Sequence, residues 1–296
     1  MRLLIQPEDG VAPLVEAIGR ARRRLELYVF RLDHEAIRSA LRAAVRRGVT
    51  VRALVAYTNR GGEASLRKLE ARLQRLGARV ARTDDDLARY HGKMMIVDRE
   101  ALYVLGYNFT RRDIERSRSL GLVTTRRDLL KEAVRLFQAD FARRPYRPRH
   151  DELVVSPANA RAVLCALIDG ARRQLLIYDD RLTDRPMIRL LRERARVGVE
   201  VKVIGHVQDK PSAIRVRKPR GRRLHVRAIV QDGRRAFVGS QSLRRLELDE
   251  RREIGLVTVD PFVAARISRV FNSDWDRAGH RRLEPASGSQ PVLRRR

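Results

Sequence analysis

Cysteine, aromatic side chains and long apolar runs are scarce in this chain of 296 residues. The one cysteine, Cys165, lies in an apolar stretch, so we expect a buried thiol, and neither a disulfide framework nor a Cys/His metal cluster can form. No run approaches the ~20 apolar residues of a membrane span, and residues 1–10 lack the apolar core of a signal peptide. We therefore expect a cytoplasmic, monomeric, globular protein with an aliphatic core, no metal and no other cofactor.

Basic residues, in contrast, are abundant, and the formal net charge is +29. Such an excess attracts polyanions, among them nucleic acid, anionic membrane surfaces and phosphorylated substrates. However, 59 of the 65 basic residues are arginine and are spread along the chain, as a general preference for arginine codons would also produce. The net charge alone therefore identifies no partner.

The two halves of the chain are copies of one repeat. Residues 48–52 align with residues 198–202 at an offset of 150, and His91 aligns with His225 at an offset of 134. Chance would not hold two constant offsets over many positions, so the chain is an internal duplication with a shorter connection in its second copy. Further aligned pairs are 4–7 with 154–157, 21–25 with 171–175, and 121–124 with 255–258.

Each repeat alternates short strands with amphipathic helices. Gly48 and Gly198 follow the second helix of their repeat, as glycines at helix C-termini do. Strands that alternate with helices favour an α/β fold with a largely parallel sheet. We therefore predict two α/β repeats, residues 1–146 and 151–280, each a mostly parallel sheet flanked by helices, followed by a disordered tail over residues 281–296.

A histidine followed two positions later by a cation recurs in both repeats. On a strand, residues i and i+2 face the same side, so both side chains can contact one phosphate. Cations offset the charge of a phosphodiester, one imidazole can attack phosphorus, and the other can protonate the leaving alkoxide and then activate an acceptor. An aspartate follows at a predicted turn, where it either caps the turn or supports the histidine. The motif residues are His91, Lys93 and Asp98 in the first repeat and His225, Arg227 and Asp232 in the second.

This doubled motif resembles the signature of the phospholipase D superfamily, H-x-K-x4-D followed by a Gly-Gly/Ser-x-Asn turn. Over about residues 2–280 the chain resembles its bacterial phospholipase D-like or cardiolipin-synthase-like members. The resemblance implies two repeats related by a pseudo-twofold axis, with one active site at their interface. It also implies that His91 and His225 are nucleophile and general acid/base, and we expect His91 to be the nucleophile. Lys93, Arg227, Asn108, Ser240 and Ser242 would then bind the phosphate, and Asp98, Asp232 and Glu253 would support or orient the histidines.

Each repeat departs from the signature at one or two positions. The first has Ser119 where Glu253 stands in the second, so it lacks an orienting acid. The second has arginine in place of lysine and Ser242 in place of the asparagine, and a guanidinium is a planar fork instead of a point charge. We still expect an active site, because both histidines and both cations are present.

The resemblance implies a metal-independent phosphodiester hydrolase or phosphatidyltransferase that acts on phospholipids through a covalent phosphohistidine. Peripheral contact with the anionic inner face of a membrane would fit this function. One alternative is a nucleic-acid phosphodiesterase of the same superfamily, which the net charge and the basic segment 210–223 before His225 favour. The other alternative is a non-catalytic module that binds polyanions at a degenerate site. The sequence does not choose between hydrolysis and transfer.

Overall fold

The first repeat forms a sheet with helices on both sides. A computed structural model describes residues 1–59, 62–209 and 212–279, so the tail predicted over 281–296 lies outside the described residues. In chain order the elements of the first repeat are β1 (Arg2–Gln6), α1 (Ala12–Arg20), β2 (Arg24–Val29), α2 (Glu35–Arg46), β3 (Thr50–Val55), α3 (Ala64–Arg75), β4 (Arg79–Arg82), β5 (Arg89–Tyr90), β6 (Met94–Val97), β7 (Ala101–Leu105), α4 (Arg111–Glu115), β8 (Ser117–Thr124) and α5 (Arg127–Phe141).

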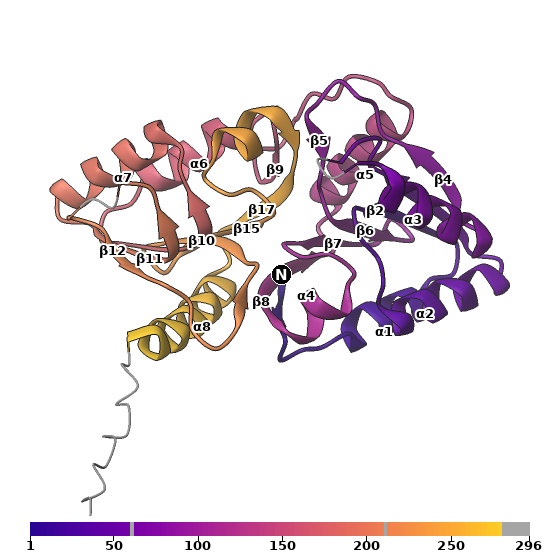
Figure 1. Cartoon of the computed structure of the whole chain (residues 1–296), viewed down its shortest axis with the longest axis horizontal. Helices are drawn as coiled ribbons and strands as arrows, with labels where there is room; N and C mark the ends of the chain where they lie inside the picture. Colours follow the sequence, from indigo (N-terminus) through magenta and orange to yellow (C-terminus); the bar gives the residue numbers. More distant parts are fainter. Residues whose placement is uncertain (60–61, 210–211, 280–296) are drawn as a thin grey trace, which may run out of the picture.

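The second repeat follows the same plan (Figure 1). Its elements are β9 (Leu153–Val155), α6 (Ala160–Asp169), β10 (Gln174–Leu182), α7 (Arg185–Arg196), β11 (Glu200–Val207), β12 (Arg215–Arg217), β13 (Arg223–Leu224), β14 (Arg227–Gln231), β15 (Arg235–Gly239), the π-helical turn η1 (Leu246–Glu250), β16 (Arg251–Arg252), β17 (Ile254–Thr258) and α8 (Pro261–Gly279).

The two sheets have the same strand order, β1-β8-β7-β6-β2-β3-β4 and β9-β17-β15-β14-β10-β11-β12. This confirms the predicted α/β class with two related repeats. The prediction of mostly parallel sheets is wrong, however, because only β2-β3-β4 and β10-β11-β12 are parallel along these paths and the other neighbours are antiparallel. The physical reason lies in the connections: β6 and β7 are joined by a tight turn at Asp98–Glu100, which only antiparallel strands allow.

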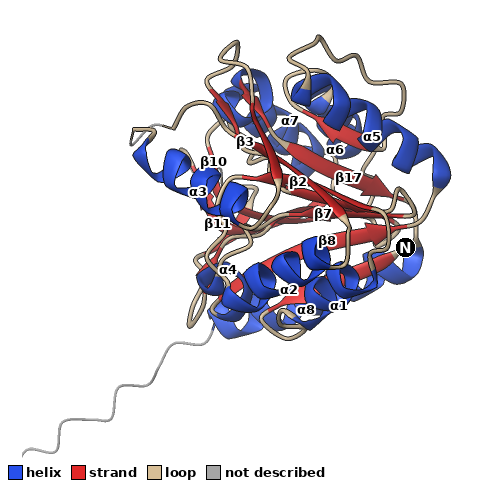
Figure 2. Ribbon diagram, turned by 90° about the vertical axis from the view of Figure 1, so that its right-hand side faces the viewer, coloured by secondary structure: helices blue, strands red, loops and turns tan. Residues whose placement is uncertain are grey.

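Helices cover the outer faces of the sheets, and the inner faces share a core (Figure 2). One apolar cluster lies between the first sheet and α1, α2 and α3, and a second lies between the second sheet and α6 and α7. The third cluster is built from the inner faces of both sheets together with α5 and α8. The two repeats are therefore held together by a common hydrophobic core.

The closing helices α5 and α8 form because their apolar residues recur every three or four positions, which places them on one face. Those faces are buried in the shared core, and each fully buried large side chain contributes roughly 1.5–3 kcal/mol of burial free energy. The buried apolar residues are Leu129, Leu130, Ala133, Leu136 and Phe137 on α5, and Val263, Ala264, Ile267, Phe271 and Trp275 on α8.

Two buried ion pairs, related by the repeat, also join the halves. Arg118 on β8 donates two hydrogen bonds to Asp274 on α8, at 2.7 and 3.2 Å. At the aligned positions, Arg252 on β16 donates to Asp140 on α5 at 2.9 and 3.1 Å. Removing one member of such a buried pair typically costs about 3–5 kcal/mol, so these pairs fix how the repeats meet.

The backbones of the two repeats approach closely at Gly106. A Cβ atom at this position would lie 2.9 Å from the carbonyl oxygen of Gly239 in the second repeat and 2.9 Å from that of Leu120. Both neighbours are backbone atoms that cannot rotate away. Glycine in the first repeat's Leu-Gly-Tyr-Asn turn therefore lets the two motif turns pack directly against each other.

Candidate active site

Each histidine follows a two-residue strand that pairs with the other repeat. β5 is parallel to β16 of the second repeat, and β13 is parallel to β8 of the first. The amide of His91 donates to the carbonyl of Arg252 at 2.7 Å, and the amide of His225 donates to the carbonyl of Arg118 at 3.0 Å. The backbone of each histidine is thus fixed by the opposite repeat, next to the arginine of a buried ion pair.

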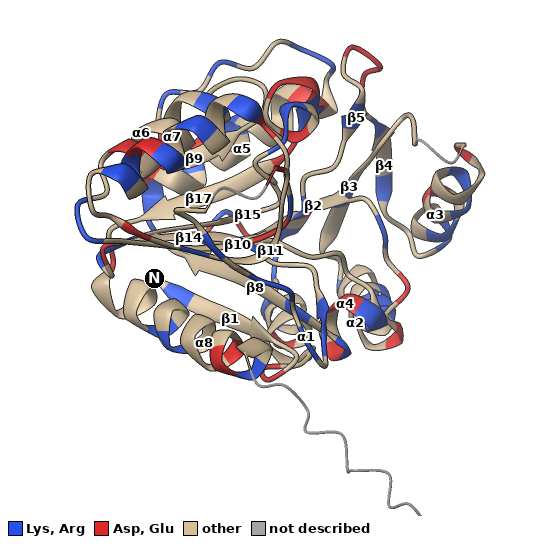
Figure 3. Ribbon diagram, turned by 60° about the vertical axis from the view of Figure 1, so that its left-hand side comes forward, with Lys and Arg blue, Asp and Glu red and all other residues tan. Residues whose placement is uncertain are grey.

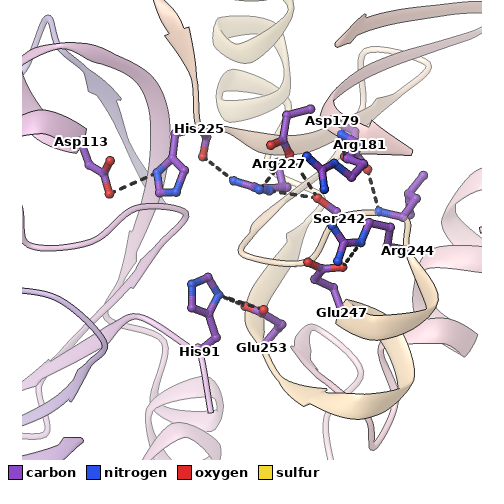
Figure 4. Close-up of polar contacts among 12 residues, drawn as sticks. His91, Asp113, Asp179, Arg181, His225, Arg227, Ser242, Arg244, Glu247 and Glu253 are labelled. Carbon is purple, nitrogen blue, oxygen red and sulfur yellow. Dashed lines mark hydrogen bonds and ion pairs between the residues drawn. The ribbon is translucent and has the colours of Figure 1, made fainter. Parts of the chain in front are cut away.

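The imidazole of His91 is held by Glu253 of the second repeat (Figure 4). Nδ1 of His91 lies 2.9 and 3.0 Å from the two carboxylate oxygens of Glu253, which is fully buried. Phe30 packs edge-on against the imidazole, with ring centroids 4.5 Å apart. The ionised carboxylate requires a proton on Nδ1, so Nε2 carries the lone pair.

The imidazole of His225 faces a different acid, Asp113 of the first repeat. Nδ1 of His225 lies 3.3 Å from Oδ2 of Asp113. The carboxylate is fixed by the backbone amide and side-chain amide of Asn108, at 3.1 and 2.8 Å, and by Arg223 at 2.7 Å. Asp113 lies on α4, whose first turn is capped by the hydroxyl of Thr110. The carboxylate therefore enters the site through a short, rigidly anchored helix.

Sequence reasoning missed Asp113. It placed the position of the acid at Ser119, whose hydroxyl is buried without a hydrogen-bond partner in the described part of the chain. A signal was present, because the offset of 134 aligns Asp113 with another acidic residue, Glu247, which is also buried. Both histidines thus have a carboxylate from the opposite repeat, although only one comes from the expected position.

The three polar residues predicted to bind phosphate contact other protein groups in this structure. Asn108 donates to Asp113, and Ser240 exchanges hydrogen bonds with the backbone of Ile254 at 3.1–3.3 Å. Ser242 accepts a hydrogen bond from Arg227 at 3.1 Å. All three side chains therefore form hydrogen bonds within the protein in this structure, and their binding of phosphate stays a prediction.

The two cations of the motif have different surroundings. Lys93 is fully buried, and its Nζ lies 2.8 Å from Nδ1 and 3.0 Å from Nε2 of His91, next to the ring. Arg227 forms an ion pair with Asp180 at 2.8 Å and donates to the carbonyl of His225 at 3.1 Å. Lys93 has no such salt-bridge carboxylate among the described residues, so its charge is the less neutralised of the two.

Burial dominates the electrostatics of the first histidine. It lowers the pKa of His91 to about 4, and the charge of Lys93 lowers this pKa further while Glu253 opposes the shift. Burial lowers the pKa of Lys93 to about 7, with Glu253 opposing and Arg227 adding to the shift. Burial disfavours ionised Glu253, but neighbouring His91 and Lys93 outweigh it and hold the pKa of Glu253 at about 2. At neutral pH, therefore, His91 is neutral and Glu253 is charged.

The second histidine is neutral as well. Burial lowers the pKa of His225 well below its usual value, and Arg227 and Lys93 lower it further, while Asp113 opposes the shift. Because Lys93 contacts His91 and its charge also acts on His225, the two imidazoles lie in one electrostatic environment. Figure 4 shows the two rings between Asp113 on one side and Glu253 on the other.

The motif aspartates do not orient the histidines, so this part of the prediction needs correction. Asp98 follows β6, at the opposite end of the strand from His91, and accepts hydrogen bonds from the amides of residues 22–24 at 2.8 Å. Asp232 accepts the equivalent bonds from residues 172–174 at 2.8–3.0 Å. Both aspartates have positive φ, near 54°, a conformation that aspartate tolerates at turns. They are turn caps that tie the hairpin to the start of the neighbouring strand.

The basic segment 210–223 is largely engaged by the protein itself. Its described part contains strand β12, and Arg217 stacks on Trp275 with its guanidinium carbon 4.4 Å from the ring centroid. Arg222 pairs with Glu8, and Arg223 pairs with Asp113. These three arginines therefore support the interface and the site from within, and their charge is partly neutralised.

The described residues contain neither a cluster of metal ligands nor a membrane-spanning helix. No group of three or more His, Cys, Asp and Glu side chains in residues 1–59, 62–209 and 212–279 is arranged to hold a metal ion. No helix in the same ranges has the length and hydropathy that crossing a bilayer requires.

Comparison with known proteins supports the resemblance found in the sequence. Residues 14–141 match the family model of the cardiolipin synthase, PLD-like domain. No curated protein matches the chain. The fold over both repeats is similar to that of phosphatidylserine synthase from Haemophilus influenzae Rd KW20, with 12% identity, a TM-score of 0.69, and coverage of 94% of this chain and 86% of that one.

Two further solved structures are similar. Polyphosphate kinase from Porphyromonas gingivalis shares 22% identity at a TM-score of 0.75, over 93% of this chain and 50% of that one, so this chain spans half the length of the kinase. Nuc, a phospholipase D family member from Salmonella typhimurium, shares 22% identity at a TM-score of 0.42, over 48% of this chain and 93% of that one. The family match thus lies in the first repeat, and the similarity to phosphatidylserine synthase shows that the shared fold extends over both repeats.

Proposed function

We propose that this protein hydrolyses or exchanges a phosphodiester bond of a phospholipid through a covalent phosphohistidine on His91, without a metal ion. The observation that supports this most is the pair of neutral imidazoles, one from each repeat, with a buried carboxylate behind each ring. The match to a cardiolipin synthase, PLD-like domain and the fold shared with a phosphatidylserine synthase favour a phospholipid as the substrate class.

The first step is an attack on phosphorus by Nε2 of His91. The bound phosphate draws the ammonium of Lys93 away from the imidazole, so that Lys93 and Arg227 offset the charge of its non-bridging oxygens. A bond forms between Nε2 and phosphorus, and the bond from phosphorus to the leaving oxygen breaks. Glu253 accepts a hydrogen bond from the Nδ1–H of His91 throughout and stabilises the positive imidazole of the intermediate.

His225 moves protons in both steps. The anionic phosphate raises the pKa of this imidazole on binding, because an opposite charge favours the protonated form. His225 then gives its proton to the leaving alkoxide and becomes neutral. In the second step it takes a proton from water or an alcohol, which attacks phosphorus and releases His91. Water completes hydrolysis, and an alcohol completes transfer.

Two alternative functions are each supported by a specific observation. The net charge of +29 favours a nucleic-acid phosphodiester as the substrate. The internal contacts of Asn108, Ser242 and Arg227 favour a non-catalytic protein that binds polyanions, because these groups are already bonded within the protein.

A substrate panel in EDTA tests the proposal. Bis(p-nitrophenyl) phosphate, phosphatidylglycerol vesicles, and single- and double-stranded DNA are incubated with the full chain, and products are followed by absorbance, lipid chromatography and gel electrophoresis. We expect turnover of the chromogenic diester and of phosphatidylglycerol. Turnover of DNA alone would replace the phospholipid assignment, and no turnover of any substrate between pH 4 and pH 9 would support the binding protein.

The rate should depend on pH as a bell with unequal limbs. Protonation of His91 removes the nucleophile only below its pKa of about 4, and Lys93 loses its charge above its pKa of about 7. On bis(p-nitrophenyl) phosphate, whose leaving group needs no proton from His225, we therefore expect kcat/KM to fall about tenfold per pH unit beyond each of these values. In Lys93→Arg the alkaline limb should disappear, because a guanidinium keeps its charge to about pH 12. An alkaline limb that stays near pH 7 in this variant would contradict the assignment to Lys93.

The role of Asp113 predicts a dependence on the leaving group. Asp113→Asn keeps the size of the side chain but removes the charge that supports protonated His225. We expect kcat on a phospholipid to fall about 10²-fold, within the range of general acid catalysis. On bis(p-nitrophenyl) phosphate the loss should be smaller, because p-nitrophenolate leaves without protonation. Equal losses on both substrates would assign Asp113 a structural role only.

A further inference from the structure

A basic groove runs along α5 on the first repeat, away from the histidines. Three cavities of about 620, 490 and 480 Å³ form it; Arg52 lines the first and second, and Arg135 lines the second and third. The groove extends from the starts of β2, β3 and β4 past the C-terminus of α5 to its N-terminal turn. His91 and Lys93 precede β6, which pairs with the far end of β2, so the groove and the candidate active site lie at opposite ends of the sheet. We call this feature the α5 groove.

All the charged side chains that line the α5 groove among the described residues are cations. Arg52 and Arg99 pair with Glu26, and Arg135 pairs with Glu132, on carboxylates buried beneath the surface. Six further cations are exposed and form no ion pair in residues 1–59, 62–209 and 212–279. These six are Arg24, Arg79, Arg127, Lys131, Arg144 and Arg147.

The second repeat provides an internal comparison. Thr50 in the α5 groove aligns with Glu200, which forms ion pairs with Lys202 and Arg215 at 2.8 and 3.0 Å. The register of the strands shows that Lys202 and Arg215 correspond to Arg52 and Arg79. The second repeat thus has a carboxylate between the two cations where the first repeat has a neutral residue, and in the described part of the first repeat only Arg52 of the two is paired, with Glu26.

Two further cations of the α5 groove, both on α5, are specific to the first repeat. Arg127 and Lys131 align with Pro261 and Ala265 at the offset of 134. Six exposed cations without ion pairs thus line one groove whose described lining holds no carboxylate, and this local clustering indicates a binding surface. Basic residues on β4, at one end of the α5 groove, are visible in Figure 3.

We propose that the α5 groove binds single-stranded nucleic acid. Its cavities have the size of pockets that hold small organic groups, in the range of about 300–1,000 Å³, so they can take single nucleotides but not a duplex. Val80, Leu130 and Phe141 form an apolar floor, and the guanidinium of Arg52 already stacks on the Phe141 ring, 4.0 Å from its centroid. Guanidinium planes stack on unpaired bases and contact the phosphates, which is the combination that single-strand binding uses. A flat membrane surface would reach the rim of the groove and leave this floor empty.

Equilibrium binding of a fluorescein-labelled 20-nucleotide dT strand tests the inference. The full chain is used with His91→Asn, so that any cleavage at the candidate active site does not consume the probe. The test variant adds Arg79→Glu, Arg127→Glu, Lys131→Glu and Arg144→Glu. The matched control adds Arg189→Glu, Arg196→Glu, Arg234→Glu and Arg266→Glu, which are exposed and without ion pairs in the described chain, so that net charge changes equally. Thermal unfolding by circular dichroism confirms that each variant is folded.

We expect the test variant to bind the strand at least tenfold more weakly in 0.1 M salt, with the control within about twofold of the parent. The slope of log affinity against log salt should fall by about 3 in magnitude for four lost phosphate contacts, at about 0.7 for each contact. Equal weakening of test and control variants would overturn the inference, because net charge alone would explain it. A second result would also overturn the inference: the parent binds phosphatidylglycerol vesicles but not the strand, and the test variant no longer binds the vesicles. That result would assign the α5 groove to a membrane. Because only binding is measured, either result is independent of the proposed phospholipid turnover.

Discussion

His91→Asn should lower kcat/KM for a phosphodiester by at least about 10⁴-fold, because replacing a nucleophile removes the covalent route and leaves only binding and charge stabilisation. Asparagine is close to histidine in size and stays polar beside Glu253 and Lys93, so the interface should keep its packing. The measurement is steady-state turnover of bis(p-nitrophenyl) phosphate at pH 6, between the two expected limbs of the pH profile.

The control for this variant is His150→Asn, in the connection between the repeats. His150 is not in contact with the candidate active site, so turnover should stay within about twofold of the parent. A loss of less than tenfold in His91→Asn, with the protein folded, would exclude His91 as the nucleophile.

Glu253→Gln should lower kcat by about 10³-fold with little change in KM. Loss of the carboxylate that orients a catalytic imidazole costs up to about 10⁴-fold in a serine protease triad, because the tautomer is no longer fixed. Here Glu253 holds Nδ1 of His91 at 2.9 Å and also favours the charged form of Lys93. Steady-state kinetics on the substrate of highest turnover separate kcat from KM.

The same variant has a pH signature that a merely structural role would not produce. Glu253 raises the pKa of both His91 and Lys93, against the effect of burial. Without its charge both pKa values fall, so the two limbs of the profile should shift to lower pH. Glu132→Gln is the control, because Glu132 is a buried carboxylate that bonds to Tyr146 outside the site. A profile that keeps its limbs in Glu253→Gln would contradict this account.

Much of the architecture could be predicted from the sequence because its signals are local or repeated. Gly48 and Gly198 predict the ends of two helices, and α2 and α7 end two residues before them. The constant offset that pairs His91 with His225 predicts two similar sheets, which the matching strand orders confirm. The predicted direction of the strands is wrong, because strand–helix alternation favours parallel strands whereas the tight turns that join β6 to β7 and β14 to β15 require antiparallel ones.

The parts of the site that the sequence does not predict depend on contacts between distant segments. Asp113 reaches His225 across 112 positions of the chain from α4, a helix of five residues that is too short for a periodic signal. The pairing of β5 with β16 and of β13 with β8 involves two residues on each strand. These contacts arise from the packing of the repeats, and neither composition nor spacing reveals them.

The covalent intermediate on His91 is the central claim, and trapping it is the most direct test. The full chain is mixed with excess phosphatidylglycerol, stopped in neutral denaturant within the first turnovers to preserve the acid-labile P–N bond, and analysed by intact mass and peptide mapping. We expect a phosphatidyl adduct on the peptide that contains His91. The adduct should be absent in His91→Asn and should still form, but more slowly, in Glu253→Gln. An adduct on His225 instead, or none during active turnover, would contradict it.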